Sequence, residues 1–550
     1  MDPNELELLN LYRTGRINRR EFLRKAALLG ASMGALPGIL AALPRAAQAA
    51  GPLAAATPQP TEAPAGPPKR GGVMKHALAA LGNLDPAFLS SIPDDEVCRQ
   101  WHDFFVYVDE DSQPDPERSL ASSWESSTDG TVWKFGVREG VTFHDGKPLT
   151  AADVVFSFDR LRDKQIGAAT VSLYANIQKV EATDNFHVTF TLQNSNPDFL
   201  LDLGDYHALI MDSKATDFKT DRNGTGPWMI ADYLPEDRIV FKRNPKYWMK
   251  GADGESLPYM DGMEYIFLNE ASAQVEALRG GQVHWVNYVD PQYVEPLKGD
   301  PNITVAMKTG NFHYAMNMRL DHKPYDDPRV VQAIKLATDR KAILDTVALG
   351  LGVTGRDTPI GPSYGDFYLD SPEITPDVAK AKSLLAEAGY QNGLEIELTA
   401  MNSLSVPAIA TVWKEQLAQA GITLNIQTMP IDTFYTDVWL QCDLGIVDWG
   451  GRPYPQPYLQ LAYMSDSPWN STHMADKELD QTAKDAGKEM DHAKRVQLYH
   501  KVQQILMERG GVIVPFFQNG LLAYRKNVIP GVKPAALAAA EDLRRVWLAS

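Results

Sequence analysis

Cysteine is scarce in this sequence, which holds only Cys98 and Cys442 among its 550 residues. So few thiols exclude a disulfide-dense scaffold, and they exclude a zinc or iron–sulfur site built from cysteine alone. A single disulfide bond between these two cysteines remains an alternative. Two separate buried thiols are the simpler expectation for residues so far apart in the chain.

Positive charge is also in short supply. The chain carries 53 Lys and Arg residues against 70 Asp and Glu residues, which gives a net charge of −17. A protein that neutralises phosphates needs a basic face, so nucleic acid is not an expected partner.

Motifs for catalysis, cofactors and metals are missing or incomplete. The sequence has neither His-Glu-x-x-His nor a phosphate-binding loop that ends in Lys-Ser or Lys-Thr. The segment Gly361–Gly365 fits Gly-x-Ser-x-Gly around Ser363. A nucleophile elbow needs a strand before the serine and a helix after it, whereas Pro362 and the loop-like residues that follow predict a turn. We therefore predict no catalytic residues, no metal site and no cofactor.

Beyond the first fifty residues, no apolar run reaches the length of a membrane span. Arg19-Arg20-Glu21-Phe22-Leu23 precedes a glycine-interrupted apolar run at Ala26–Leu43, and small residues follow at Ala46–Ala50. This order is typical of a cleaved export signal, and the adjacent arginines resemble the twin-arginine motif. An uncleaved membrane anchor is the alternative, but the glycines and the short run make it marginal.

We therefore expect residues 1–50 to be a signal peptide that the twin-arginine translocase recognises. Residues 51–70 are rich in proline and alanine, which predicts an extended tether. The mature protein is then expected to be soluble in the periplasm.

The mature chain shows both strand and helix patterns. Apolar residues alternate at Trp133–Arg138 and at Phe186–Leu192, which predicts half-buried strands. Thr150 and Asp153 form a capping-box pattern at the start of a helix. Asp327 followed by Pro328 predicts another helix, which we expect to end by Gly350.

The second half contains a strand–helix–strand pattern. Strands are predicted at Leu394–Leu398 and Ile422–Ile426, with a helix from Pro407 to Ala420 between them. Such a unit places its two strands parallel in one sheet. A long helix is predicted at Lys494–Arg509, and the last strand at Val512–Phe517.

Four sets of residues occur in one order along the chain and together are specific. They are Leu120–Glu125 with Phe143–Ser157, Gly224–Trp228 with Arg243–Trp248, Pro324–Val330 with Ala337–Arg340, and Ala379–Tyr390. This ordered set resembles the extracytoplasmic solute-binding proteins of peptide-, opine- and nickel-type ABC importers, known as bacterial solute-binding protein family 5.

The resemblance implies an α/β, two-lobed periplasmic-binding-protein fold of the large peptide-binding, Venus-flytrap type, with hinge strands between the lobes. It implies that residues 71–311 and 511–550 form lobe 1 and that residues 312–510 form lobe 2. A ligand would lie between the lobes, and closure would bury it.

The resemblance also implies the function. The chain would be the periplasmic substrate-binding component of an ABC importer, and not an enzyme. It would capture a small organic solute, peptide-like or opine-like, and deliver it to the permease complex in the inner membrane. One alternative is a general oligopeptide-binding protein. An alternative of another class is a secreted hydrolase, which would need a nucleophile and base that the sequence does not display.

One segment of lobe 2 departs from the family pattern. Peptide-binding members carry a Trp-Gly-Ala-Asp-like segment whose aspartate holds the amino group of the peptide, and in Val447–Pro457 that place is taken by Arg452. A guanidinium forms a bidentate fork with a carboxylate, so Arg452 predicts a solute with an acidic group. The alternative is an internal pair between Arg452 and Asp448. Some dipeptide binders also have an arginine in the loop that corresponds to Asn402–Val406, which is uncharged here.

Aromatic and polar residues near Arg452 complete the expected ligand site. Trp449, Tyr454, Trp469 and Asn470 are predicted pocket walls, although aromatic residues pack equally well in a lobe core. Asp448 is predicted either to lock Arg452 or to contact an amine of the solute.

Overall fold

The computed structural model describes residues 67–89, 91–168, 170–218, 221–531 and 542–549. The described residues from 67 on belong to one compact unit. The predicted signal peptide and most of the predicted tether therefore lie outside the described residues.

Several helices begin in the structure at the residues where the sequence pattern predicts their start. Thr150 and Asp153 form the predicted capping box ahead of α5 (Ala151–Arg162). The Asp327 carboxylate accepts a hydrogen bond from the backbone of Arg329 and so caps α9 (Pro328–Ala337). Side-chain oxygens at these positions satisfy backbone N–H groups that have no partner inside the helix.

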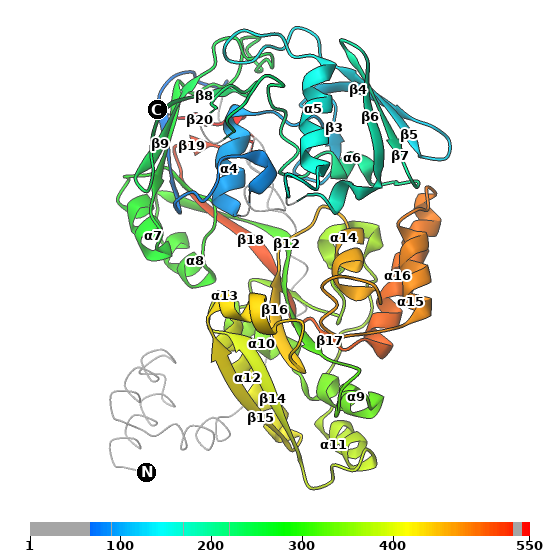
Figure 1. Ribbon diagram of the computed structural model, residues 1–550. Coiled ribbons are helices and arrows are strands. Elements are labelled where there is room, and N and C mark those ends of the chain that lie inside the picture. Colours follow the sequence, from blue (N-terminus) through cyan, green and yellow to red (C-terminus); the bar gives the residue numbers. More distant parts are fainter. Residues whose placement is uncertain (1–66, 90, 169, 219–220, 532–541, 550) are drawn as a thin grey trace. The chain divides into compact units, whose positions relative to one another are not determined.

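The remaining helices fall into two groups along the chain. The first group is α4 (Ile92–Trp101), α6 (Phe199–Asp202), α7 (Ala271–Arg279) and α8 (Pro291–Lys298). The second group is α10 (Arg340–Val347), α11 (Val378–Glu387), α12 (Val406–Gln419), α13 (Ile431–Thr433), α14 (Gln456–Tyr458), α15 (Lys477–Ala486) and α16 (His492–Arg509). They lie in different halves of the unit (Figure 1).

In the described part of the chain, a twelve-stranded mixed sheet runs through both halves. Its main path is β15 (Ile422–Met429), β14 (Leu394–Met401), β16 (Leu444–Trp449), β12 (Ile303–Met318), β18 (Phe516–Arg525), β11 (Trp285–Val286), β1 (Val73–Leu78), β10 (Gly262–Phe267), β9 (Arg238–Arg243) and β8 (Trp228–Leu234). Two short strands join it, β13 (Gly352–Thr354) on β18 and β17 (Val512–Ile513) on β12.

A second sheet lies in the first half and contains both strands predicted there. Its order is β4 (Ala121–Ser126), β5 (Val132–Val137), β7 (His187–Leu192) and β6 (Ile177–Asp184). Two short antiparallel pairs complete the strands, β2 (Tyr107–Val108) with β3 (Pro114–Asp115) and β19 (Val528–Ile529) with β20 (Trp547–Leu548).

Two long strands connect the halves (Figure 1). Residues 303–308 of β12 pair with β18, the register then shifts between Lys308 and Phe312, and residues 313–318 pair with β16. Gly310 lies in this bulge, where a Cβ atom would come within 2.6 Å of the Gln518 carbonyl oxygen. Only glycine allows so close an approach between the two backbones, so the connection between the halves depends on it.

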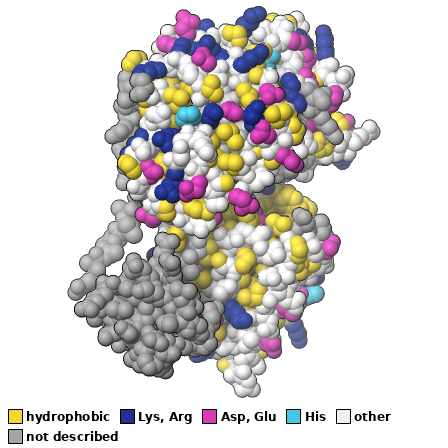
Figure 2. Space-filling model, turned by 90° about the vertical axis from the view of Figure 1, so that its left-hand side faces the viewer, with side chains coloured by type: hydrophobic (Ala, Val, Ile, Leu, Met, Phe, Trp, Pro, Cys, Tyr) yellow, Lys and Arg dark blue, Asp and Glu magenta, His cyan; other side chains and the backbone are white. Residues whose placement is uncertain are grey.

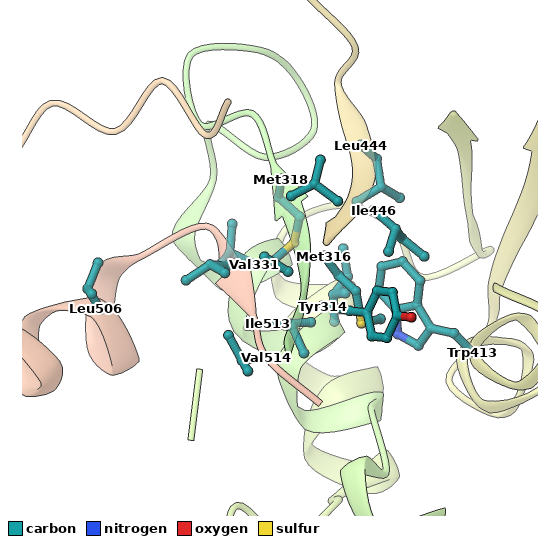
Figure 3. Packing of buried hydrophobic residues seen from close by; sticks show 14 of the residues in the cluster. Tyr314, Met316, Met318, Val331, Trp413, Leu444, Ile446, Leu506, Ile513 and Val514 are labelled. Carbon is teal, nitrogen blue, oxygen red and sulfur yellow. The ribbon is translucent and has the colours of Figure 1, made fainter. Parts of the chain in front are cut away.

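The buried side chains of the described residues form separate clusters in the two halves of the unit. Residues between Tyr314 and Phe517 form one hydrophobic cluster, part of which Figure 3 shows around Met316, Ile446 and Trp413. The clusters of the other half take in residues from Met74 to Ile303 and from Leu521 to Trp547. Phe517 thus packs with the second half of the unit, and Leu521 packs with the first half.

Two predicted elements are each divided in the structure. The helix expected from Pro328 to Gly350 ends at Ala337, and α10 begins at Arg340, because Asp339 caps a new helix through the backbone N–H of Ala342. The strand expected at Val512–Phe517 breaks after Ile513 and resumes at Phe516. Pro515 has no N–H to donate to a continuous ladder.

Three general expectations can be compared with the described residues. Cys98 and Cys442 are both free thiols, as expected, but Cys442 is half-buried rather than buried. None of the helices in the described ranges is long and apolar enough to cross a membrane. No group of three or more His, Cys, Asp or Glu side chains in those ranges is placed to hold a metal ion.

Candidate functional site

The predicted site residues gather at one edge of the lobe 2 sheet. β14 is parallel to β15 and to β16, so the carboxyl ends of all three strands meet at the same edge. In open α/β sheets ligands bind outside the carboxyl ends of parallel strands. This edge carries the segments after each strand and lies toward lobe 1 (Figure 1). On one face of the molecule the surface is hollowed between the lobes, and hydrophobic side chains gather there (Figure 2).

Arg452 follows β16 and is held by its backbone. Its N–H donates to the Tyr458 hydroxyl over 3.2 Å, and its carbonyl accepts from the Tyr364 hydroxyl over 2.9 Å. In the described part of the chain no carboxylate oxygen lies within 4.0 Å of its guanidinium, and its buried Nε has no hydrogen-bond partner. Burial raises the pKa of the Tyr206 phenol in lobe 1, and the positive charge of Arg452 acts in the opposite direction. Among the described residues the guanidinium therefore has no charged partner, and its charge reaches Tyr206 of lobe 1.

Asp448, at the end of β16, does not form the alternative internal pair with Arg452. It is half-buried, and its Oδ1 accepts a hydrogen bond of 2.7 Å from the Tyr435 hydroxyl. The two opposite charges near the end of this strand are thus separate groups, each without a salt bridge among the described residues.

The structure brings Trp449 and Trp469 together but engages Asn470 elsewhere. The two indole rings lie 5.9 Å apart, and Trp469 also lies 5.7 Å from Trp439. Trp449 is buried in the lobe core, whereas Trp469 is 36% exposed. The Asn470 amide donates to the carbonyls of Met464 and Met474, so this side chain stabilises its own turn.

Tyr454 makes a contact between the lobes instead of lining a pocket wall alone. Its hydroxyl donates to the Asp202 carboxylate of lobe 1. Beside it, Arg495 forms a buried ion pair with Asp198, and the Ser195 hydroxyl donates to the Lys488 carbonyl over 2.7 Å. We call these three bonds the interlobe contact.

The interlobe contact includes two buried carboxylates. Arg495 pairs with Asp198, and Asp202 accepts a hydrogen bond from Tyr454. Burial raises the pKa of Asp202 to about 8, although the hydrogen bond from Tyr454 acts in the opposite direction. Burial also raises the pKa of Asp198, despite the charge of Arg495. A carboxyl group that is buried in this way favours its protonated form.

Several residues of this region were not predicted from the sequence. Tyr435 and Trp439 follow β15, and Tyr364 lies in the turn that contains Ser363. The first two could have been found, since they follow a predicted parallel strand at its carboxyl end. Nothing in the sequence pairs Asp198 with Arg495, which are far apart in the chain and meet only through the fold.

A second hollow lies elsewhere on lobe 2. It is lined by residues 391–395, Lys414, Ala418 and residues 421–424. These residues surround the amino ends of β14 and β15, the opposite edge from Arg452. The position of the charged and aromatic side chains therefore favours the carboxyl edge as the ligand site.

Two lobes joined by paired strands, with charged and aromatic side chains near their interface, are the architecture of a two-lobed ligand-binding protein. The chain belongs to the bacterial extracellular solute-binding proteins, family 5, whose family model matches residues 115–472.

Individual relatives agree with this assignment. Di/tripeptide-binding protein 2 of Pseudomonas aeruginosa (strain UCBPP-PA14) is 30% identical over 476 residues, which cover 78% of this chain and 86% of that protein. The Helicobacter pylori periplasmic binding protein DppA in complex with the peptide STSA has a TM-score of 0.74 at 23% identity, covering 88% of this chain and 99% of that one. The Agrobacterium protein AgaA in complex with agropinic acid has a TM-score of 0.73 at 24% identity, covering 87% and 99%. At these identities the two structures establish the fold.

The hydrolase alternative finds no support in the structure. Ser363 lies in a 3-10 turn, Pro362–Phe367, and not between a strand and a helix. Its buried hydroxyl has no hydrogen-bond partner among the described residues, so no base activates it.

Proposed function

We propose that this chain is the periplasmic binding component of an ABC importer for a peptide-like or opine-like solute that carries an acidic group. Arg452 carries the proposal, because its guanidinium has no carboxylate partner among the described residues and can form a fork with the acid of a solute. The relatives that bind dipeptides, tripeptides and agropinic acid support these two solute classes. Trp449, Tyr454, Trp469 and Asp448 complete the proposed site, whereas Asn470 is occupied by its own turn.

The proposal gives a direct expectation for the purified protein. When the protein is purified without denaturation, native mass spectrometry should find a small acidic compound bound. After its release from the protein, this compound should be chemically unchanged. Added back at a hundredfold excess over Kd, it should stabilise the fold by about 2.7 kcal/mol, measured as a higher Tm. Chemical conversion of the compound during incubation would instead favour an enzyme.

A general oligopeptide binder is the second candidate, supported by the peptide-binding relatives. Such a protein holds the peptide backbone without selecting for charged ends. The two candidates differ in one measurement, since only the first loses affinity when the acidic group of the solute is converted to an amide.

We also propose export by the twin-arginine route, with cleavage after the signal peptide and delivery of the loaded protein to an inner-membrane permease. The adjacent Arg19 and Arg20 support the first step. Changing both to lysine should leave the precursor in the cytoplasm, as measured by cell fractionation and immunoblotting. Normal periplasmic delivery of the double variant would exclude this route, and a variant with Arg13→Lys alone serves as the control.

A further inference from the structure

Two leucines have a backbone conformation that leucine rarely adopts. Leu349 and Leu404 each have a φ of 54°, and in the described ranges they are the only apolar residues other than glycine with a positive φ. This left-handed region costs an L-residue free energy, because its Cβ atom comes close to the following carbonyl oxygen. Neither leucine offsets the cost by burial, since Leu349 is 54% and Leu404 is 58% exposed. Each position therefore needs its own explanation.

The end of a helix explains Leu349. It directly follows Ala348, the last capping residue of α10. The next residue is Gly350, whose N–H donates to the Leu344 carbonyl over 3.2 Å. A left-handed residue just after the last helical turn is a common way for a helix to end. The strain at Leu349 thus belongs to the local fold.

No helix ends at Leu404, which lies in the turn between β14 and α12. At the start of this turn, the Asn402 N–H donates to the Met429 carbonyl over 2.8 Å. At its end, the Ser405 N–H donates to the Tyr314 hydroxyl over 3.3 Å. The two bonds fix the turn on both sides of Leu404. Glycine or asparagine would adopt this conformation with less strain, so the leucine points to a function for its side chain.

The turn lies at the carboxyl edge of the lobe 2 sheet, beside the segment that follows β15. Met401 and Met429 are partners in the β14–β15 register, so Leu404 and Ile431 follow two adjacent strand ends. Ile431 is also exposed, and it begins α13, which lies at the end of lobe 2 nearer to lobe 1 (Figure 1). Two exposed aliphatic side chains therefore lie at the same edge as Arg452, which follows β16.

We propose that Leu404 and Ile431 form an apolar wall of the solute site, which selects a solute with an apolar side chain. This inference rests on the proposed function and deepens it, because the acidic group of the solute binds Arg452 while its side chain contacts the wall. Both wall residues are exposed in the structure, so a bound solute removes their apolar surface from water. That gain depends on the side chain of Leu404 and would be absent with glycine.

Calorimetry with matched probe pairs tests the wall. Leucine and asparagine side chains are similar in size but differ in polarity. L-Leucyl-L-alanine and L-alanyl-L-leucine are compared with the same dipeptides that carry asparagine in place of leucine. The N-carboxyethyl derivatives of leucine and asparagine form an opine-like pair. In at least one pair we expect the wild-type protein to bind the leucine probe about tenfold or more tightly, because burial favours the aliphatic side chain and costs the amide its hydration.

Leu404→Asn is the informative variant, because asparagine tolerates the left-handed region and keeps the size of leucine but not its apolar surface. It should lower the preference for leucine probes about fivefold or more. The Tm of the ligand-free variant should stay the same or rise, since the strain is relieved. Leu349→Asn makes the same change at the same φ on another turn, and it should keep the full preference. Ile431→Ala should lower the preference, as Leu404→Asn does.

Each other outcome counts against one of the two proposals. Equal binding of leucine and asparagine probes by the wild type, or an unchanged preference in Leu404→Asn, would overturn the apolar wall and leave the proposed function intact. An equal loss of preference in Leu349→Asn, or a lower Tm in Leu404→Asn alone, would show an effect through the fold and would also overturn the wall. Failure of the wild type to bind any of the probes would overturn the proposed solute classes, and the wall with them.

Discussion

Arg452→Ala is expected to weaken binding of an acidic solute by about thirtyfold or more, because truncating one member of a buried charge pair costs roughly 2–5 kcal/mol. The guanidinium has no carboxylate within 4.0 Å in the described part of the chain, so the loss should come from the solute and not from a broken internal pair. For the same reason the Tm of the ligand-free protein should change little. L-Alanyl-L-alanine and its C-terminal amide are suitable probes in calorimetry.

Two comparisons sharpen this prediction. Arg452→Lys should recover only part of the affinity, because an ammonium group cannot form the bidentate fork. Arg329→Ala removes the same charge from an exposed position on α9 and should leave binding unchanged. Near-native affinity of Arg452→Ala, or equal binding of the dipeptide and its amide by the wild type, would contradict the role of Arg452.

Local sequence signals predicted the secondary structure of lobe 2 well, because its elements follow from short-range physics. The alternating strand at Leu394–Leu398 is the start of β14, and the helix and strand that follow it appear as α12 and β15. The errors arose where a single residue competes with a longer pattern. Asp339 starts a new helix inside one apolar periodicity, and Pro515 divides an apolar run into two strands.

The candidate site was only partly predictable. Arg452 stood out because its charge is unexpected at that position in the resembling family, and Asp448 stood out as its neighbour. The two do not pair in the structure, and Asp448 instead accepts a hydrogen bond from Tyr435, which comes from a different segment. Contacts of this kind, and those between Asp198 and Arg495, require the three-dimensional fold, since no local pattern relates residues so far apart.

We expect the interlobe contact to make closure of the ligand-free protein dependent on pH. Asp202 is buried against Tyr454, and the other groups that face it are Asn196, Asp198 and Asp205. Burial raises its pKa to about 8, and we expect opening to expose the carboxyl group to solvent and to return its pKa toward 3.8. The closed form therefore holds a proton that the open form releases. This contribution to closure is fully present below pH 3.8 and is lost as the pH rises through about 8.

The expected result is a closed-to-open ratio that falls by up to tenfold for each pH unit across this range, since one proton is linked to closure. Small-angle scattering should show a larger radius of gyration at pH 9 than at pH 5.

The Asp202→Asn variant should reduce this difference and stay compact at pH 9, because a carboxamide resembles the protonated acid and still accepts a hydrogen bond from Tyr454. Asp159→Asn, an exposed change on α5 of the same lobe, should behave as the wild type. The raised pKa of Asp198 acts in the same direction, so the variant retains a weaker dependence rather than none. A radius of gyration that is the same at pH 5 and pH 9 in the wild type would show that the interlobe contact does not control closure.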